Sequence, residues 1–299
     1  MTTPKRVFIL GGGAALGAHQ VGAIKYLGEQ GVTPDAIVAS SIGVINACAY
    51  ACGGVERLEQ SWREFRSIPQ IISPSLRHNP LWGYSLFSMD RLSAAVERFI
   101  DFRDVLASPL SLEFVVLNLS RGAGEVRSKA ECTSWRELRT LTRAGYAIPV
   151  LFPPVRYRGD WYVDGGFAWN VPLDRAIMLG ATEIYILAPI ASELPYKGSF
   201  GGLLGPFIDF AQRFVDVMWR TIGNMGYLYA LLDEGKFHGV PVTIIEPQVE
   251  WSGFGPLAVF QAYPRKSANL MAAGYRDAKR AIARQRRRAS MRPTLRSVS

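Results

Sequence analysis

Two strand–turn–helix corners follow one another near the start of the chain, and they constrain its fold more than any other feature. The first runs from an apolar strand at residues 6–10 through the glycine-rich turn GGGAALG at residues 11–17 into a helix. The second runs from a strand at residues 37–40 through the corner around Ser41 into another helix. Strands and helices continue to alternate along the chain, which is typical of a parallel sheet with helices on both faces. We therefore expect a three-layer α/β/α sandwich with a mainly parallel central sheet.

A serine in a tight corner between a buried strand and a helix has the geometry of a nucleophile elbow. Small residues on either side of this serine, Ala39 and Gly43, let the strand and the helix approach closely. The serine then stands at a helix N-terminus, where unpaired N–H groups favour negative charge. The glycine-rich turn supplies further backbone N–H groups, and we expect an oxyanion hole made by Gly11, Gly12 and Gly13.

A serine hydroxyl becomes a good nucleophile only when a base takes its proton. The chain contains three histidines, none of them in a recognisable triad motif: His19, His78 and His238. Asp164 is better placed, because it ends a short predicted strand and is followed by Gly165 and Gly166, which allow a sharp turn. A carboxylate bonded directly to the Ser41 hydroxyl can act as the base if its site is dry. The residues therefore indicate a Ser41–Asp164 dyad.

Several separate motifs, in this order along the chain, resemble the patatin-like phospholipase family. The glycine-rich turn leads into GAHQVG at residues 17–22, and the elbow continues into its helix as SIGVINA at residues 41–47. The segment AIPVLFPPV at residues 147–155 resembles the stretch that precedes the family's Asp-Gly-Gly, here residues 164–166. The resemblance covers about residues 5–190.

The resemblance implies a serine-dependent lipid acyl hydrolase of the phospholipase A or esterase type. It implies a lipid or other ester as substrate, with no cofactor and no metal. Two positions depart from the family pattern: Ala39 stands where a glycine is usual, and Leu16 stands where an arginine or lysine is usual. Because Leu16 removes a cation beside the expected oxyanion hole, a second interpretation stays open. It is a catalytically weak or silent relative that binds lipid, a membrane or a granule.

The glycine-rich turn also fits a dinucleotide-binding fold, in which a glycine pattern follows a strand and opens a helix. Such a fold needs an acidic residue about 20 positions further on, at the end of the second strand. Asp35 instead precedes that strand, and Ser40 and Ser41 occupy its end. The mismatch argues against a nucleotide site, and the absorbance of a bound cofactor in the purified protein would separate the two interpretations.

The positive charge of the chain is concentrated at its C-terminal end. The whole chain has 34 Lys and Arg against 25 Asp and Glu, a net charge of +9. Residues 265–299 hold 11 of the basic residues and one acidic residue, which leaves a net charge of −1 on the remainder. Such an end suits an anionic partner, and we expect contact with anionic membrane rather than with nucleic acid. We place an acyl hydrolase domain at residues 5–283 and a basic, disordered tail at residues 284–299.

An uncharged run of 20 residues at positions 36–55 is long enough to span a membrane. It contains Ser40, Ser41, Asn46 and three glycines, and the strand-then-turn pattern explains it better. The first residues do not resemble a secretory signal, and the chain has only three cysteines. We therefore expect a cytoplasmic protein with peripheral contact at the inner membrane face.

The sequence predicts the structure of several other segments. Residues 68–87 contain three prolines and three aromatics and predict a loop, either a substrate-facing flap or a loop packed on the body. Residues 198–232 follow a helical apolar pattern and predict either a cover for the sheet edge or an acyl-chain pocket. We also expect Asn170 to cap a helix that begins at Pro172, and a last helix at residues 267–284.

Overall fold

The structure is a computed structural model that describes residues 5–64, 73–74, 78–79, 83–85, 87–189, 226–248 and 264–290. Its strands are β1 (Arg6–Leu10), β2 (Ala36–Ala39), β3 (Ser73–Pro74), β4 (His78–Asn79), β5 (Gly83–Tyr84), β6 (Phe87–Ser88), β7 (Ser111–Asn118), β8 (Ala123–Ser128), β9 (Val155–Tyr157), β10 (Asp160–Asp164), β11 (Glu183–Leu187), β12 (Lys236–Phe237) and β13 (Val240–Ile245). Its α-helices are α1 (Ala18–Glu29), α2 (Ile42–Glu64), α3 (Asp90–Glu97), α4 (Phe102–Ala107), α5 (Trp135–Gly145), α6 (Leu173–Met178), α8 (Gly226–Leu231) and α9 (Pro264–Ser290). Short 3-10 helices are η1 (Ala14–Gly17), η3 (Lys129–Glu131) and η4 (Gly165–Phe167).

Parallel strands form the centre of a nine-stranded mixed sheet. The strand order is β12-β13-β11-β1-β2-β7-β10-β9, with β8 paired to β7. Strands β13, β11, β1, β2 and β7 run parallel, and the antiparallel strands β12, β8, β10 and β9 extend the two sides. The predicted α/β sandwich with a mainly parallel centre is confirmed. Because Leu10 pairs with Ala39, the glycine-rich turn and the serine corner leave the sheet at the same edge.

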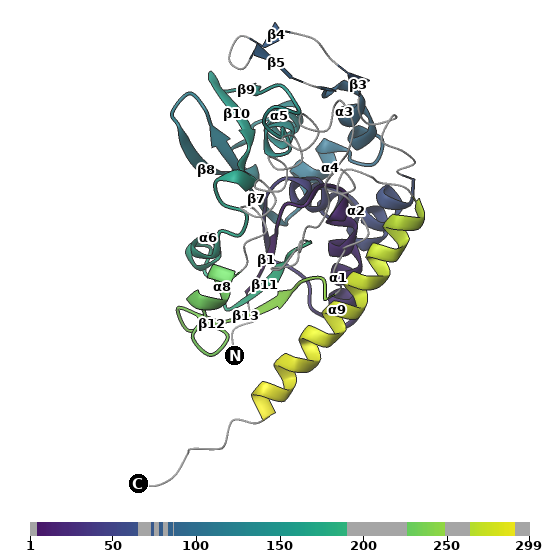
Figure 1. Ribbon diagram of the computed structural model, residues 1–299, viewed down its shortest axis with the longest axis vertical. Coiled ribbons are helices and arrows are strands. Elements are labelled where there is room, and N and C mark those ends of the chain that lie inside the picture. Colours follow the sequence, from purple (N-terminus) through teal and green to yellow (C-terminus); the bar gives the residue numbers. More distant parts are fainter. Residues whose placement is uncertain are drawn as a thin grey trace, which may run out of the picture.

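Helices cover both faces of this sheet (Figure 1). Along β1, Phe8 and Leu10 lie in an apolar core shared with α1, α2, α5 and α9, whereas Val7 and Ile9 lie in a second core with α6 and α8. All four side chains are fully buried. Burial on both faces explains why this strand is a continuous apolar run instead of an alternating one.

Helix α9 packs lengthwise on α1 (Figure 1). A Cβ on Gly22 would lie 1.7 Å from the Met271 carbonyl oxygen, and one on Gly274 would lie 1.8 Å from the His19 carbonyl oxygen, so both glycines permit the close approach. The His19 side chain is fully buried in this contact, with its Nε2 3.0 Å from Asp277 Oδ2. Burial opposes it, but hydrogen bonds from His19 and a neighbouring arginine keep the pKa of Asp277 below its usual value. His19 therefore joins two helices.

The end of α9 differs from the expected boundary. The helix continues past Arg284 to Ser290, where the sequence predicted a disordered tail from residue 284 onward. Ala281 and Ile282 are buried against the body of the protein and anchor these last turns. The arginine, glutamine and alanine residues that follow have high helix propensity, so the helix does not end with its buried face. Residues 291–299 lie outside the described part of the chain.

Some other expectations are corrected or lie outside the described residues. The predicted cap at Asn170 is wrong, because α6 begins at Leu173 after Pro172 and has no side-chain cap. Of residues 198–232, only 226–232 are described, and the alternatives for this segment and for residues 68–87 lie mostly outside the described chain. Residues 36–55 form β2, the corner and part of α2, and none of the described helices combines the length and apolarity needed to cross a membrane.

Candidate active site

Ser41 lies in a strained backbone conformation between β2 and α2. Its φ angle is +54°, in the left-handed region that non-glycine residues seldom adopt, and its N–H donates to the Gly145 carbonyl oxygen over 3.1 Å. Strain of this kind persists only where the surroundings fix it, and it gathers at functional sites. A Cβ on Gly43 would lie 2.2 Å from the Leu10 carbonyl oxygen, so α2 can begin this close to β1 only with glycine there. The corner therefore has the geometry expected of a nucleophile elbow.

Asp164 ends β10 and is buried beside Ser41. Its side chain is 1% exposed, its Oδ1 accepts the Gly166 N–H over 2.8 Å, and its Oδ2 has no hydrogen-bond partner among the described residues. Burial raises the pKa of Asp164 to about 7, while the Ser41 hydroxyl and the Gly166 N–H act against that rise. An unsatisfied buried carboxylate oxygen is costly, and it is available to accept a proton. Asp164 therefore has the environment of a general base that works near neutral pH.

Three backbone segments converge on these two side chains. A Cβ on Gly12, in the glycine-rich turn, would lie 2.7 Å from the Ser41 Cβ. One on Gly166 would lie 3.2 Å from Asp164 Oδ1 and 3.8 Å from the Ser41 Cβ. A Cβ on Gly165 would lie 2.4 Å from backbone atoms of β7. Side chains at Gly12 and Gly166 would fill the space around the serine, so their absence keeps the site open, whereas glycine at position 165 lets the turn after Asp164 pack closely on β7.

The predicted oxyanion donors differ in their availability. The Gly11 N–H donates to the Leu187 carbonyl oxygen over 3.2 Å, and the Gly12 N–H donates to Asn170 Oδ1 over 2.6 Å. Both donors are therefore engaged inside the protein. In the described part of the chain, the N–H groups of Gly13 and Ala14 have no acceptor. Of the three expected donors, only that of Gly13 is available, and the next free N–H belongs to Ala14.

Asn170 lies in the site, a position that the sequence did not indicate. Its Oδ1 accepts hydrogen bonds from the Gly12 N–H at 2.6 Å and from the Ser40 hydroxyl at 2.7 Å. It follows Asp164 in the chain, so one amide ties the loop after Asp164 to the glycine-rich turn and to Ser40, the residue before Ser41. Ala39 ends β2 and is 1% exposed, so the methyl group that departs from the family pattern is accommodated within the core.

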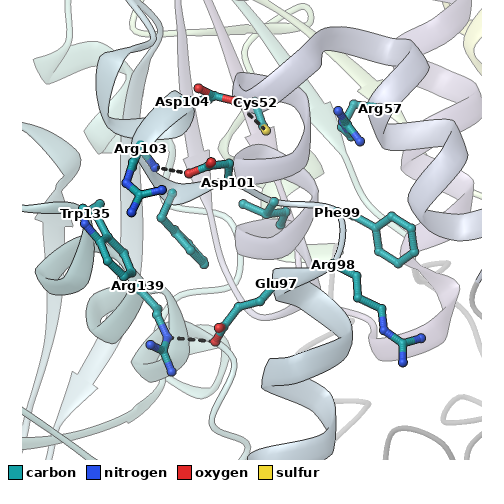
Figure 2. A pocket seen from close by; sticks show the side chains of 12 residues that line it. Cys52, Arg57, Glu97, Arg98, Phe99, Asp101, Arg103, Asp104, Trp135 and Arg139 are labelled. Atoms are coloured by element: carbon teal, nitrogen blue, oxygen red, sulfur yellow. Dashed lines mark hydrogen bonds and ion pairs between the residues drawn. The ribbon is translucent and has the colours of Figure 1, made fainter.

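A separate hollow of about 380 Å³ lies among α2, α3, α4 and α5 (Figure 2). Across it Arg139 pairs with Glu97 at 2.8 Å, and the Cys52 thiol faces Asp104 at 3.9 Å. The hollow borders the segment before β7, whose start pairs with the start of β2, whereas Ser41 follows the end of β2. It therefore lies toward the opposite edge of the sheet from Ser41. Within the described residues, no three His, Cys, Asp or Glu side chains gather as metal ligands would.

Comparisons with known proteins place the chain in a family. A profile of the family Patatin-like phospholipase matches residues 8–177. The chain is 29% identical over 180 residues to patatin-like phospholipase domain-containing protein 6 of Mus musculus, and 29% identical over 189 residues to lysophospholipase nte1 of Aspergillus niger. Each match covers 59% of this chain, and the chain spans only 13% and 11% of the two relatives. A solved structure with some similarity is VipD from Legionella pneumophila, with 13% identity and a TM-score of 0.48 over 95% of this chain and 67% of that one.

The matched region contains the glycine-rich turn, the corner at Ser41 and Asp164 with its two glycines. It spans more than half of the sequence, from β1 into α6. The chain therefore belongs to the patatin-like phospholipase family.

Proposed function

We propose that this protein is a serine-dependent lipid acyl hydrolase of the phospholipase A or esterase type, with Ser41 as nucleophile and Asp164 as general base. The observation that carries the proposal is the convergence at Ser41 of a strained backbone and a buried carboxylate whose pKa is raised to about 7. Membership of the family and the similarity to a lysophospholipase support a lipid ester as the substrate.

In the proposed first half-reaction, Asp164 accepts the proton of the Ser41 hydroxyl while Oγ attacks the ester carbonyl carbon. The developing oxyanion accepts hydrogen bonds from the N–H groups of Gly13 and Ala14, which are free to donate. As the tetrahedral intermediate collapses, Asp164 gives the proton to the departing alcohol oxygen, and the acyl group stays on Ser41 Oγ.

In the second half-reaction, water attacks the acyl-serine carbonyl carbon and Asp164 accepts a proton from that water. The same N–H groups hold the second oxyanion. When this intermediate collapses, Ser41 Oγ leaves the carbonyl carbon and recovers the proton from Asp164. The fatty acid is released and the dyad returns to its starting state.

The proposal is tested by hydrolysis of lysophosphatidylcholine. Ser41→Ala is expected to reduce turnover to the level without enzyme. Ser61→Ala is the matched control, because Ser61 is also 8% exposed and its hydroxyl donates to the Leu58 carbonyl oxygen within α2. Hydrolysis that survives Ser41→Ala but follows protein concentration would rule out the assigned nucleophile.

The pH dependence of hydrolysis is expected to follow the ionisation of Asp164. Only the carboxylate can accept the serine proton, and burial raises its pKa from 3.8 to about 7. Values of kcat/KM are therefore expected to fall about tenfold per pH unit below pH 7 and to level off above it. Initial rates between pH 4 and pH 9 measure this profile, and an acid limb near pH 4 would show that the base is not a buried carboxyl.

We also propose that the basic end of α9 contacts anionic membrane. Arg284, Arg286 and Arg287 are exposed on its last turns. Each basic residue near an anionic surface contributes about 1 kcal/mol at low salt, so replacing all three by alanine is expected to weaken vesicle binding about 100-fold. Sedimentation with phosphatidylserine vesicles measures the effect, and phosphatidylcholine vesicles are the control. Equal binding of wild type and the triple alanine variant to the phosphatidylserine vesicles would contradict the proposed contact.

A further inference from the structure

A continuous series of buried side-chain amides joins the glycine-rich turn to the helix that follows the nucleophile. The indole Nε1 of Trp62 donates to Asn46 Oδ1 over 2.8 Å. Asn46 Nδ2 donates to Gln20 Oε1 over 2.8 Å and to the Gly17 carbonyl oxygen over 3.0 Å. Gln20 Nε2 then donates to the Gly11 carbonyl oxygen over 2.7 Å. The series therefore reaches the first and the last residue of the turn.

The direction of every hydrogen bond in this series is fixed by its chemistry. Indole N–H can only donate, so the oxygen of Asn46 must face Trp62 and its amide nitrogen must face Gln20. The oxygen of Gln20 then faces Asn46, and its amide nitrogen points at the carbonyl oxygens of Gly11 and, at 2.9 Å, Leu187. One donor-only side chain thus sets the orientation of two amides.

The side chains of the series are buried, so each of their polar groups needs a hydrogen-bond partner. Gln20 and Asn46 are fully buried and Trp62 is 5% exposed. Buried amides are costly unless their donors and acceptors are satisfied, and here both amide oxygens accept while each amide nitrogen donates twice. Such fully connected networks are rigid and favour one arrangement of the backbone they hold.

The backbone held by the series is the part that carries the free N–H groups. The Gly11 N–H is bonded to the Leu187 carbonyl oxygen and the Gly11 carbonyl oxygen to Gln20, so the peptide groups before and after Gly11 are both fixed. The Gly17 carbonyl oxygen is bonded to Asn46, which lies on α2 about one turn after its first residue. The segment between these two anchors contains Gly13 and Ala14.

We propose that Gln20 and Asn46 are positioning residues, which hold the glycine-rich turn against α2 so that its free N–H groups face Ser41. Leu16 is 4% exposed and packs in the apolar core with residues of α1 and α2. A cation at that position would be buried, and the amide series orders the turn without one. The order of the turn follows from the structure alone, whereas its catalytic consequence rests on the proposed function.

The test compares Gln20→Met and Asn46→Leu, which remove the amides at similar volume, with wild type. Hydrogen–deuterium exchange of the peptide covering residues 11–17 is expected to be at least about tenfold faster in both variants. Hydrolysis of lysophosphatidylcholine is expected to lose about 10- to 100-fold in kcat with little change in KM, because displaced donors act on the transition state. Gln60→Met is the matched control, since Gln60 is exposed on α2, and it is expected to change neither quantity.

Leu16→Arg provides a second arm. Because the series already orders the turn, this variant is expected to unfold at lower temperature and to hydrolyse no faster than wild type. A rate above wild type would show that the turn lacks a cation and would overturn the proposal.

The exchange measurement needs no catalysis, so it tests the positioning role of Gln20 and Asn46 separately from the proposed hydrolase function. If wild type does not hydrolyse the ester, the proposed function fails, and the exchange rates still decide the role of the series. Unchanged exchange over residues 11–17 in folded Gln20→Met would overturn the proposal. If that variant does not fold, Trp62→Phe, which removes the indole N–H and part of the ring but keeps both amides, is expected to show a smaller acceleration of exchange. Unchanged exchange in folded Trp62→Phe would likewise overturn the proposal.

Discussion

Asp164→Asn is expected to lower kcat for ester hydrolysis by about 10⁴-fold, because the amide has the shape of the carboxylate but cannot accept the serine proton. The fold is expected to persist, since asparagine can still accept the Gly166 N–H through its side-chain oxygen. Burst and steady-state rates with a chromogenic ester measure the loss. Retention of more than about a tenth of the activity would exclude Asp164 as the base.

The same substitution is expected to raise the free energy of unfolding at pH 8. Burial raises the pKa of Asp164 from 3.8 to about 7, so the folded protein holds this proton more tightly than the unfolded chain does. The resulting stability is present below pH 3.8 and is lost as the pH rises through about 7, a loss on the order of 4 kcal/mol. Asparagine does not titrate and avoids that loss.

Thermal unfolding at pH 4 and at pH 8 measures this effect. The variant is expected to unfold at a higher temperature than wild type at pH 8 and at a similar temperature at pH 4. Asp160→Asn, on the same strand, is the control. The Asn118 side chain and then Arg121 lower the pKa of Asp160, so its carboxylate stabilises the fold and this variant is expected to unfold at a lower temperature than wild type at pH 8. A lower unfolding temperature of Asp164→Asn than of wild type at pH 8 would show that the ionised Asp164 side chain stabilises the fold. That result would contradict a pKa raised by burial.

Gly43→Ala is expected to destabilise the protein by about 3 kcal/mol or more and to abolish hydrolysis. The added Cβ would lie 2.2 Å from the Leu10 carbonyl oxygen, so α2 must move away from β1 and carry the Ser41 corner with it. Gly28→Ala is the matched control, because a Cβ there meets nothing within 4 Å and the position lies inside α1. This control is expected to be neutral or stabilising by up to about 1 kcal/mol. Equal unfolding temperatures for the two variants would contradict the close contact at the elbow.

The features that the sequence predicted are local ones. The strand at residues 6–10, the turn after it and the corner at Ser41 are contiguous in the chain, and their patterns reflect burial and turn geometry directly. Asp164 could be proposed as the base from the sequence because Gly165 and Gly166 follow it and because the order of motifs is specific. The layered fold then follows from the alternation of elements, and the structure confirms it.

The features that the sequence did not predict depend on contacts between distant residues. Asn170 accepts a hydrogen bond from Gly12, 158 positions earlier in the chain. The sequence around Asn170 does not distinguish a helix cap from a residue of the site. The expected oxyanion donors were chosen from the glycine pattern, but their availability depends on acceptors that come from β11 and from the loop after Asp164. The extension of α9 is a separate case: the basic charge after Arg284 predicted disorder, whereas the helix propensity of the same residues continues the helix to Ser290.

The most direct test of the central claim is labelling by a fluorophosphonate probe, which reacts with an activated serine. Wild type, Ser41→Ala and Asp164→Ala are compared side by side, each shown to be folded by circular dichroism. We expect labelling of wild type alone, which would demonstrate a serine activated by Asp164. Labelling of all three proteins, or of none, would contradict the Ser41–Asp164 dyad, and the absence of labelling would favour a silent relative that binds lipid without cleaving it.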